Sequence, residues 1–259
     1  MNSQAQFYEW FATAYESLYK VIDAEKTVQQ WNGLLQTVLP AEQRKTPLRL
    51  LDVGCGPGWH LPHWHRRGFI VAGLDFCMAM LELAKAEWSR EIGEEVPPLY
   101  CADLLNLAGP ILTAPPFDIL VLHSNLIHLF SPETLCSLFG ALELLGAPGA
   151  LMMADFTSTT LLMESSRDTT EIHGMPWEHT SRFDLARGIL KHTWSNGTNS
   201  MTQLTWPIEP EGYDRLLGET GWTVRSRVGW DPQDFDTPFR EERNDHTRRV
   251  TIYVRNDRR

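Results

Sequence analysis

The hydrophobic positions of the chain follow two different patterns. In residues 5–39 the apolar side chains recur at steps of three and four, which is typical of amphipathic helices. The pattern breaks near Asp23, so two helices are predicted there. From residue 48 onward, short and nearly continuous apolar runs alternate with helical stretches. Such runs are typical of a parallel sheet whose two faces are covered by helices.

The alternating region predicts seven strands and the helices between them. A helix is expected to begin near Pro62, where proline suits a first helical turn. Further helices are predicted over residues 78–91, 132–145 and 211–221. The predicted strands are residues 48–53, 69–74, 98–102, 117–122, 149–155, 222–228 and 248–255.

Residues 157–205 interrupt this alternation. The segment begins with four hydroxyl side chains and is rich in histidine and tryptophan. Residues 183–194 and 200–206 are predicted to form a hairpin that turns at Asn196-Gly197, a pair favoured in tight turns. The segment is therefore expected to be an insertion over the sheet.

Polar residues gather where the predicted strands end. The first strand runs into a loop with glycine at alternate positions, Gly54, Gly56 and Gly58, and glycine lets a ligand approach the backbone closely. Doubly wound sheets bind ligands beyond the carboxyl ends of their strands. The pattern predicts one shared site for a nucleotide-type ligand. The other strand-end residues are Asp75, Asp103, His123 and Asp155.

The composition of the chain limits the kinds of molecule that it is expected to bind. The 259 residues carry a formal net charge of −10, which argues against a sequence-independent grip on nucleic acid. A basic C-terminal end is interpreted mainly as solvated strand edge and tail. No apolar run approaches membrane-spanning length and no secretory signal is recognised, so a cytoplasmic location with no membrane partner is expected. The cysteines have no metal-type spacing and are expected to be reduced: Cys55, Cys77, Cys101 and Cys136.

The loop spacing discriminates between nucleotides. A dinucleotide fold would place its glycines as G-x-G-x-x-G, whereas this chain has G-x-G-x-G with Trp59 where a third glycine would fall. Asp75 is placed to accept hydrogen bonds from ribose hydroxyls, a role shared by both classes of cofactor. Asp103, after the third strand, is placed to meet an adenine amine.

Taken in order, these segments resemble the class I S-adenosylmethionine-dependent methyltransferases of the small-molecule type. Residues 50–58 resemble the first motif of that family, and Gly73-Leu74-Asp75 with Met78 and Met80 resembles the second. Residues 101–104 resemble the third motif, and residues 117–120 with the loop to His128 resemble the fourth. The match covers roughly residues 48–156. It implies a Rossmann-like, doubly wound, seven-stranded sheet, mostly parallel, with its last strand antiparallel.

The resemblance implies one domain in four parts and a small-molecule partner. The parts are an N-terminal helical cap (1–46), a cofactor-binding core (47–156), a lid-like insertion over the substrate site (157–205), and the C-terminal helix and last strands (206–259). A monomer or homodimer is expected, without a metal. Asp118 is assigned a structural role. The residues expected to bind S-adenosylmethionine are Tyr15, Asp52, Gly54, Gly56, Gly58, Asp75, Phe76, Asp103, Leu104 and His123.

Histidines are the candidate bases for methyl transfer, because their pKa lies near neutrality. His123 and His128 flank the loop of the fourth motif and are the expected catalytic residues. The insertion histidines could reach the substrate only if the insertion folds over the site. They are His173, His179 and His192. A metal site at His60, His63 and His65 is disfavoured by their spread around a short helix.

The sequence says less about the methyl acceptor than about the cofactor. The residues expected to bind it are Tyr8, Tyr19, Asn125, Trp177 and Arg182. The tyrosines of the first helix serve either packing or a lid, and the insertion tryptophans either stack on a compact aromatic or cationic acceptor or simply pack. Arg182 and Arg187 either clamp a carboxylate or are solvated.

The expected function is methyl transfer to oxygen or nitrogen of a small metabolite or natural product by in-line displacement. One alternative is a cofactor-binding partner or regulatory protein without turnover. An RNA-base methyltransferase is disfavoured by the charge and by the absence of an Asn-Pro-Pro-Tyr-type motif. A dinucleotide oxidoreductase is the most distant alternative.

Overall fold

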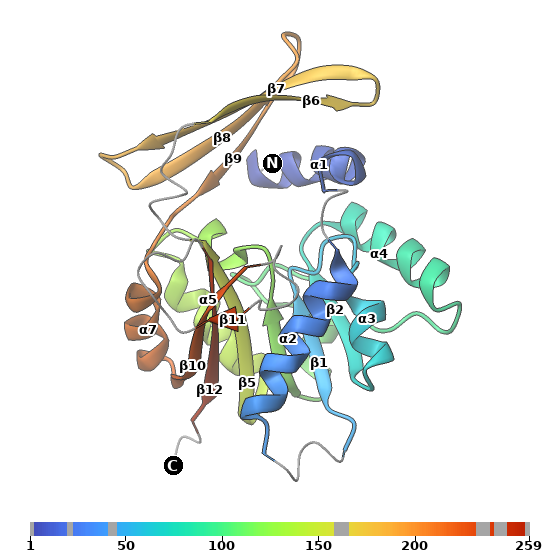
Figure 1. Cartoon of the computed structure of the whole chain (residues 1–259), viewed down its shortest axis with the longest axis vertical. Coiled ribbons are helices and arrows are strands. Elements are labelled where there is room, and N and C mark those ends of the chain that lie inside the picture. Colours follow the sequence, from blue (N-terminus) through green and yellow to red (C-terminus); the bar gives the residue numbers. More distant parts are fainter. Residues whose placement is uncertain are drawn as a thin grey trace.

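A mixed sheet of eight strands lies beneath a separate antiparallel sheet of four strands (Figure 1). The computed structural model describes residues 3–19, 23–40, 46–157, 166–231, 239–240 and 248–256. The large sheet consists of β1 (Arg49–Val53), β2 (Ile70–Asp75), β3 (Leu99–Cys101), β4 (Phe117–Leu122), β5 (Gly146–Thr157), β10 (Trp222–Trp230), β11 (Phe239–Arg240) and β12 (Arg248–Arg255).

The large sheet has the order β11-β10-β12-β5-β4-β1-β2-β3. Strands β1 to β5 pair in parallel, and β12 is antiparallel to both of its neighbours, β5 and β10. The predicted doubly wound sheet with an antiparallel last strand is therefore confirmed. The two-residue edge strand β11 was not predicted, because two residues carry no periodic signal.

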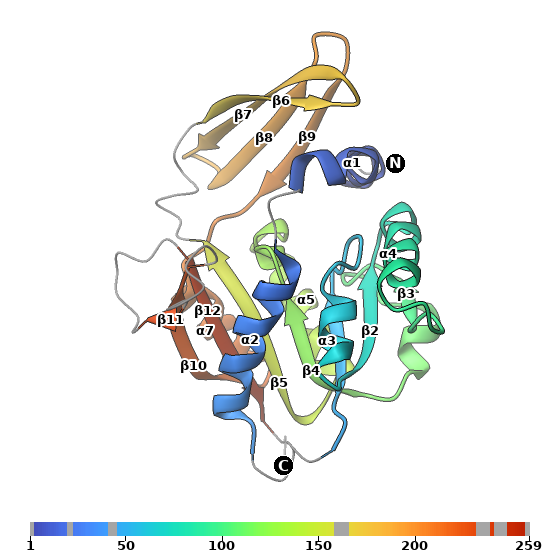
Figure 2. The same cartoon turned by 45° about the vertical axis from the view of Figure 1, so that its right-hand side comes forward.

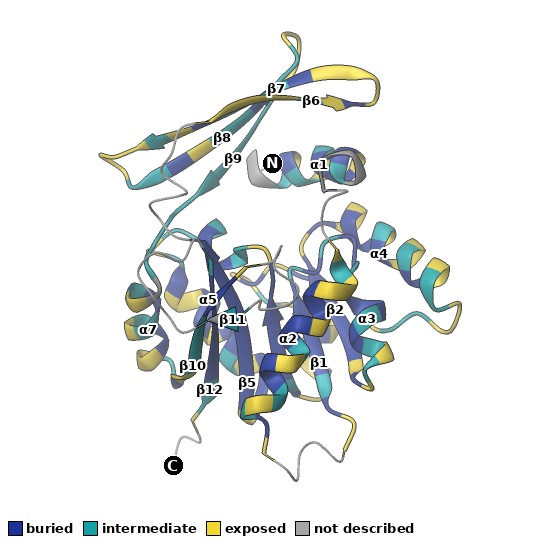
Figure 3. Cartoon of the chain, in the orientation of Figure 1, coloured by how far each residue is buried: buried dark blue, intermediate teal, exposed yellow. Residues whose placement is uncertain are grey.

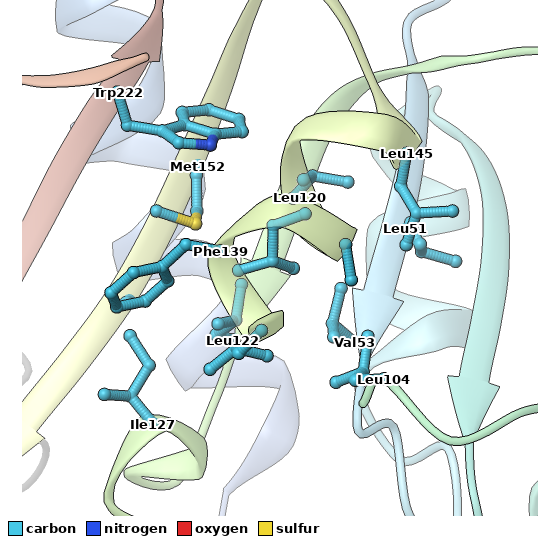
Figure 4. Close-up of a cluster of buried hydrophobic side chains, with 14 of the residues drawn as sticks. Leu51, Val53, Leu104, Leu120, Leu122, Ile127, Phe139, Leu145, Met152 and Trp222 are labelled. Atoms are coloured by element: carbon cyan, nitrogen blue, oxygen red, sulfur yellow. The ribbon is translucent and has the colours of Figure 1, made fainter. Parts of the chain in front are cut away.

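Helices cover both faces of the large sheet (Figure 2). Side chains of β1 alternate between the faces: Leu50 packs with Trp31 on one, and Leu51 packs with Phe139 on the other. Figure 4 shows the second of these clusters, in which Leu120, Phe139 and Met152 meet. The helices are α2 (Ala24–Val38), α3 (Leu61–Arg66) and α4 (Met78–Glu91) on the first face, and α5 (Leu135–Leu145) and α7 (Pro210–Glu219) on the second.

The break predicted near Asp23 is present. Helix α1 (Ser3–Tyr19) ends before it, and the Asp23 carboxylate accepts a hydrogen bond from the Lys26 amide at the start of α2. An N-cap of this kind stabilises a helix by about 1 kcal/mol. The predicted boundary between the first two helices therefore has a capping residue as its cause.

The insertion differs in detail from the predicted hairpin. Its sheet has four strands, β6 (Arg167–Ile172), β7 (Met175–Asp184), β8 (Ile189–Ser195) and β9 (Ser200–Thr205). The predicted strand 183–194 is broken by a turn, in which Asp184 accepts a hydrogen bond from the Ala186 amide. Strand β6 was missed because most of its residues are polar and exposed (Figure 3).

Helix α1 lies between this small sheet and the rest of the molecule (Figures 1 and 2). Phe7, Phe11 and Ala14 of α1 are buried with Trp177 and Trp194 of the small sheet. We call α1 and the four-stranded sheet together the roof. The two parts of the roof come from opposite halves of the sequence and share one apolar cluster.

No helix among the described residues has the length and apolarity needed to cross a membrane.

Candidate functional site

A cavity of about 650 Å³ lies between the carboxyl ends of the central strands and the roof. Its floor includes Gly54 and Gly56 after β1, Asp75 at the end of β2 and the loop after β4. Tyr8 and Tyr15 of α1 and several side chains of β8 and β9 form its upper wall. Four of the strand-end residues that were expected to share one site therefore line the cavity, namely Gly54, Asp75, Asp103 and His123, whereas Asp155 does not.

The loop after β1 is fastened to the end of β2. Asp75 accepts hydrogen bonds from the backbone amides of Gly56 and Cys77, both at 2.9 Å, one with each oxygen. Burial raises the pKa of the Asp75 carboxyl, and these amides, with that of Phe76, oppose the rise. Each carboxylate oxygen retains acceptor capacity toward a ligand. Asp75 thus shapes the loop and faces the cavity.

The glycines of the loop serve different purposes. Gly56 has a φ of +53°, and a Cβ added there would lie 3.9 Å from the Tyr15 hydroxyl, in the direction of the cavity wall. Gly58 has a φ of +71°, and its Cβ would lie 2.7 Å from the Cβ of Ala84 in α4. Gly58 therefore lets α4 pack against the loop and does not line the cavity, contrary to its expected role as a cofactor contact.

The next two strands add an aromatic and an acidic wall. Phe76 is 41% exposed and meets the ring of Tyr8 edge-on at 5.1 Å. Asp103 lines the cavity and accepts a hydrogen bond from the Leu105 amide, while the adjoining Leu104 is buried beside it. All three of the expected adenosine contacts, Phe76, Asp103 and Leu104, are brought to one side of the cavity.

The loop after β4 holds a strained backbone at the cavity floor. Ser124 and Asn125 both have φ values near +58°, at +59° and +57°. Asp155 accepts a hydrogen bond from the Asn125 amide, and the Asn125 side chain accepts one from the Thr157 amide. Such conformations cost about 1–3 kcal/mol each and concentrate at functional sites. Asn125 lines the cavity, but its side-chain oxygen is used to fix the end of β5.

His123 is packed in a stack of rings. Its ring lies 4.0 Å from that of His60 and 4.2 Å from that of Trp31, measured between centroids. Its Nε2 is buried and has no hydrogen-bond partner among the described residues. Burial, followed by the neighbouring His60, holds the pKa of His123 well below its usual value. His123 borders the cavity with its ring committed to packing.

Asp52 lies beside His60 and His123 and does not line the cavity, although it was expected among the cofactor residues. Ligand atoms of Asp52, His60 and His123 lie within 4.8 Å of one another, and burial, with the nearby Asp75 carboxylate, raises the pKa of Asp52 to about 8. A metal lies near the plane of a ligating imidazole, yet the two rings are nearly parallel, at 15°. No single position near these two residues lies in the planes of both rings, so the geometry does not support a metal site there.

His128 belongs to a buried hydrogen-bond network. Its Nδ1 lies 3.1 Å from the Tyr213 hydroxyl and 3.3 Å from the carbonyl oxygen of Trp206, whose amide donates to the His128 carbonyl. Burial lowers the pKa of His128 to about 4. His128 borders the cavity, but its hydrogen bonds connect the loop after β4 with the segment that follows β9.

Burial of His128 makes its contribution to stability depend on pH. Between its ordinary pKa of 6.5 and about 4, the folded state holds fewer protons on His128 than the unfolded state does, so stability falls as pH falls. In urea unfolding from pH 7 to 4, the wild type should lose stability more steeply than His128→Asn, by up to about 1.4 kcal/mol per pH unit. The other described histidines whose pKa is lowered by burial contribute equally to both proteins and cancel in this comparison. Parallel curves would contradict the assignment.

Several expected acceptor contacts do not reach the cavity. Trp177 packs against Trp10 of α1 at 4.9 Å and is 4% exposed, because it joins the two parts of the roof. Arg182 is exposed on β7 and outside the cavity wall. The side chain of Tyr19 lies outside the described residues. Of the expected acceptor contacts, Tyr8 and Asn125 are the ones that line the cavity.

The structure adds residues that the sequence argument left open. His179, His192 and Trp194 of the small sheet line the cavity, so the insertion does fold over the site. Gln203 of β9 joins them and donates a hydrogen bond to the Tyr8 hydroxyl at 2.8 Å. The only signal in the sequence was the unusual density of histidine and tryptophan in this segment.

The comparisons with known proteins agree on the nature of the core. A family model described as a methyltransferase domain matches residues 50–149. A putative methyltransferase of Geobacillus sp. strain WCH70 is 35% identical over 80 residues. The malonyl-[acyl-carrier protein] O-methyltransferase of Erwinia billingiae is 44% identical over 43 residues. The matched segments span 31% and 17% of this chain, and the same shares of those two relatives.

Solved structures extend the likeness over the whole fold. An S-adenosylmethionine-dependent methyltransferase from Clostridium acetobutylicum superimposes with a TM-score of 0.74 at 15% identity, covering 96% of this chain and 99% of that one. The CcbJ methyltransferase of Streptomyces caelestis gives 0.70 at 14% identity, with coverage of 95% and 99%. The sugar N-methyltransferase KedS8 from a Streptoalloteichus species gives 0.64 at 20% identity, with coverage of 96% and 93%.

Proposed function

We propose that the chain is a class I S-adenosylmethionine-dependent methyltransferase and that it methylates oxygen or nitrogen of a small molecule. One observation carries the proposal. The glycine loop, fastened to Asp75 through the Gly56 amide, borders a cavity at the carboxyl ends of the strands. Ligand sites of doubly wound sheets lie at this position.

The residues of the cavity fit S-adenosylmethionine. At Gly56 a side chain would project toward the cavity wall at Tyr15, so glycine leaves room for the methionine portion against the backbone. The spare acceptor capacity of Asp75 suits the ribose hydroxyls, and Phe76 offers an exposed ring to the adenine. Asp103 is placed to accept from the adenine amine, with Leu104 as an apolar neighbour.

The chain's own task is to align and enclose the reactants. When bound, S-adenosylmethionine supplies an electrophilic methyl group on a sulfonium. Alignment of the nucleophile with that group lowers the barrier by about 7–11 kcal/mol in favourable cases. Tyr8, Tyr15 and Trp194 of the roof line the cavity, and their rings would limit the access of water to the bound reactants.

The cavity wall supports a small acceptor without strong negative charge. Its volume of about 650 Å³ falls within the range of small-molecule sites, about 300–1,000 Å³. Among the described residues, no lysine or arginine lines it, whereas Asp75 and Asp103 do. Aromatic side chains predominate on the roof side. An amine or hydroxyl on a compact, partly apolar molecule suits these walls best.

Binding measurements test the proposal. Calorimetry should detect S-adenosylmethionine and S-adenosylhomocysteine but not NAD, because the loop has Trp59 in place of the third glycine of a dinucleotide site. A protein that binds NAD and neither sulfur nucleoside would refute the family function. A protein that binds both sulfur nucleosides but transfers no methyl group to amines, phenols or alcohols would be the cofactor-binding partner instead.

A further inference from the structure

Three side chains of the small sheet form a hydrogen-bonded chain that ends at the cavity. Asp168 of β6 and His179 of β7 face each other across the strands, and the Oδ1 of Asp168 lies 3.1 Å from the Nδ1 of His179. The Nε2 of His179 lies 3.2 Å from the Nδ1 of His192 on β8. His179 and His192 line the cavity, whereas Asp168 does not.

When both histidines are neutral, the carboxylate of Asp168 fixes the positions of their protons. An ionised carboxylate only accepts hydrogen bonds, so the Nδ1 of His179 must carry a proton. In neutral His179 the Nε2 is then an acceptor, and the Nδ1 of His192 must donate to it. This leaves the Nε2 of His192 as a bare lone pair, which is the form a general base requires.

Packing holds the chain in place. The ring of Trp194 stacks on His179 with centroids 4.5 Å apart and planes 25° apart. The rings of His179 and His192 are nearly parallel, with an angle of 9° between their planes. Burial, with His179 as the second cause, lowers the pKa of His192 to about 4, so it is neutral near pH 7. No other part of the proposed function uses these three residues.

We propose that His192 is the general base for the methyl acceptor, with His179 and Asp168 as positioning residues. This inference rests on the proposed function and narrows its substrate class to acceptors that carry a proton on the attacking atom, a hydroxyl or an N–H amine. The proposal replaces the expectation that His123 or His128 is the base. The ring of His123 is stacked on His60, and the ring of His128 is hydrogen-bonded to Tyr213.

The step balances without a further reactant. The acceptor oxygen or nitrogen forms a bond to the methyl carbon with its lone pair, and the electrons of the broken carbon–sulfur bond remain on sulfur. The acceptor proton passes to the Nε2 of His192. The positive charge that results is stabilised through His179 by the carboxylate of Asp168, as in an oriented base–acid pair.

The tautomers can be measured without knowing the acceptor. In nitrogen-15 spectra of histidine-labelled protein at pH 7, His192 should carry its proton on Nδ1 and have a bare Nε2. In Asp168→Ala, both rings should shift toward the Nε2-protonated form that free imidazole side chains favour. Asp184→Ala, which removes another exposed carboxylate of the same sheet, should leave both rings unchanged. Protonation of His192 on Nε2 in the wild type would overturn the inference.

Turnover separates this inference from the proposed function. With benzylamine and catechol as probe acceptors, His192→Gln should lower kcat about 100-fold to 10,000-fold, while calorimetry shows unchanged affinity for S-adenosylmethionine. Equal turnover of His192→Gln and wild type would overturn the role of His192 and leave methyl transfer intact. No binding of S-adenosylmethionine by the wild type would instead refute the proposed function, and the spectra would still decide the hydrogen-bonded chain.

Discussion

Asp75→Ala should weaken S-adenosylmethionine binding about 100-fold or more, equivalent to about 2.7 kcal/mol. The substitution removes two effects at once. It frees the Gly56 and Cys77 amides that hold the glycine loop, and it removes the acceptor expected for the ribose. Calorimetric titration with S-adenosylmethionine measures the loss directly.

Asp75→Asn should lose nearly as much, because its amide nitrogen must face one of the two backbone amides. Asp118→Ala is the matched control. Asp118 also accepts a hydrogen bond from a backbone amide, that of Arg49 at 2.8 Å, but at the opposite end of the sheet. We expect the control to retain its affinity. Equal affinities of Asp75→Ala and wild type would contradict both the site and the cofactor.

Gly58→Ala should destabilise the fold by about 2–5 kcal/mol. A left-handed backbone costs a side chain about 1–2 kcal/mol, and forced packing costs about 1–3 kcal/mol more. The second cost arises because the new Cβ would lie 2.7 Å from the Cβ and 3.1 Å from the Cα of Ala84. The backbone of α4 cannot yield as a flexible side chain would. Urea unfolding at pH 7 gives the free energy.

Gly68→Ala isolates the packing part of that loss. Gly68 has a φ of +88°, yet a Cβ added there meets no atom within 4 Å. Its substitution should therefore cost only the backbone penalty, about 1–2 kcal/mol. If both variants lose the same stability, α4 shifts at no cost and the close approach of Gly58 to Ala84 has no structural importance.

The parts of the molecule that local patterns specify were predictable. The helix over Met78–Glu91 and the strand over Phe117–Leu122 have the predicted ends. The apolar spacing inside each segment and the residues that flank it are enough to define both ends. The glycine loop and Asp75 follow from the same kind of local spacing. Strand β6 was not predictable, since its polar side chains are stabilised by pairing with β7 rather than by burial.

Contacts between distant segments account for the rest of the site. The pairing of Asp168 with His179, and of His179 with His192, depends on the register of three strands. The sequence contains the three residues but no measure of that register. Trp177 was misassigned for a related reason, because an aromatic side chain in an insertion serves packing as readily as recognition, and here it meets Trp10.

The basic C-terminal strand also has a structural explanation. Arg249 forms ion pairs with Glu209 and Glu211, and Arg255 lies 4.0 Å from Glu143. The guanidinium of Arg248 lies over the ring of Trp230 at 5.8 Å. These arginines are engaged within the fold on a strand that is paired on both sides, so the expected solvated strand edge is wrong for the described part of this end.

Tryptophans lie both in the apolar cluster of the roof and in the main core, so the molecule has two separate sets of fluorescent side chains. Trp10, Trp177 and Trp194 lie in the roof, while Trp31, Trp64 and Trp222 are fully buried in the main core. The roof joins residues as far apart as Tyr8 and Gln203, 195 positions along the chain, and contacts of such long range form slowly. We therefore expect a late kinetic phase in tryptophan fluorescence during refolding, as α1 docks onto the small sheet after the core has formed.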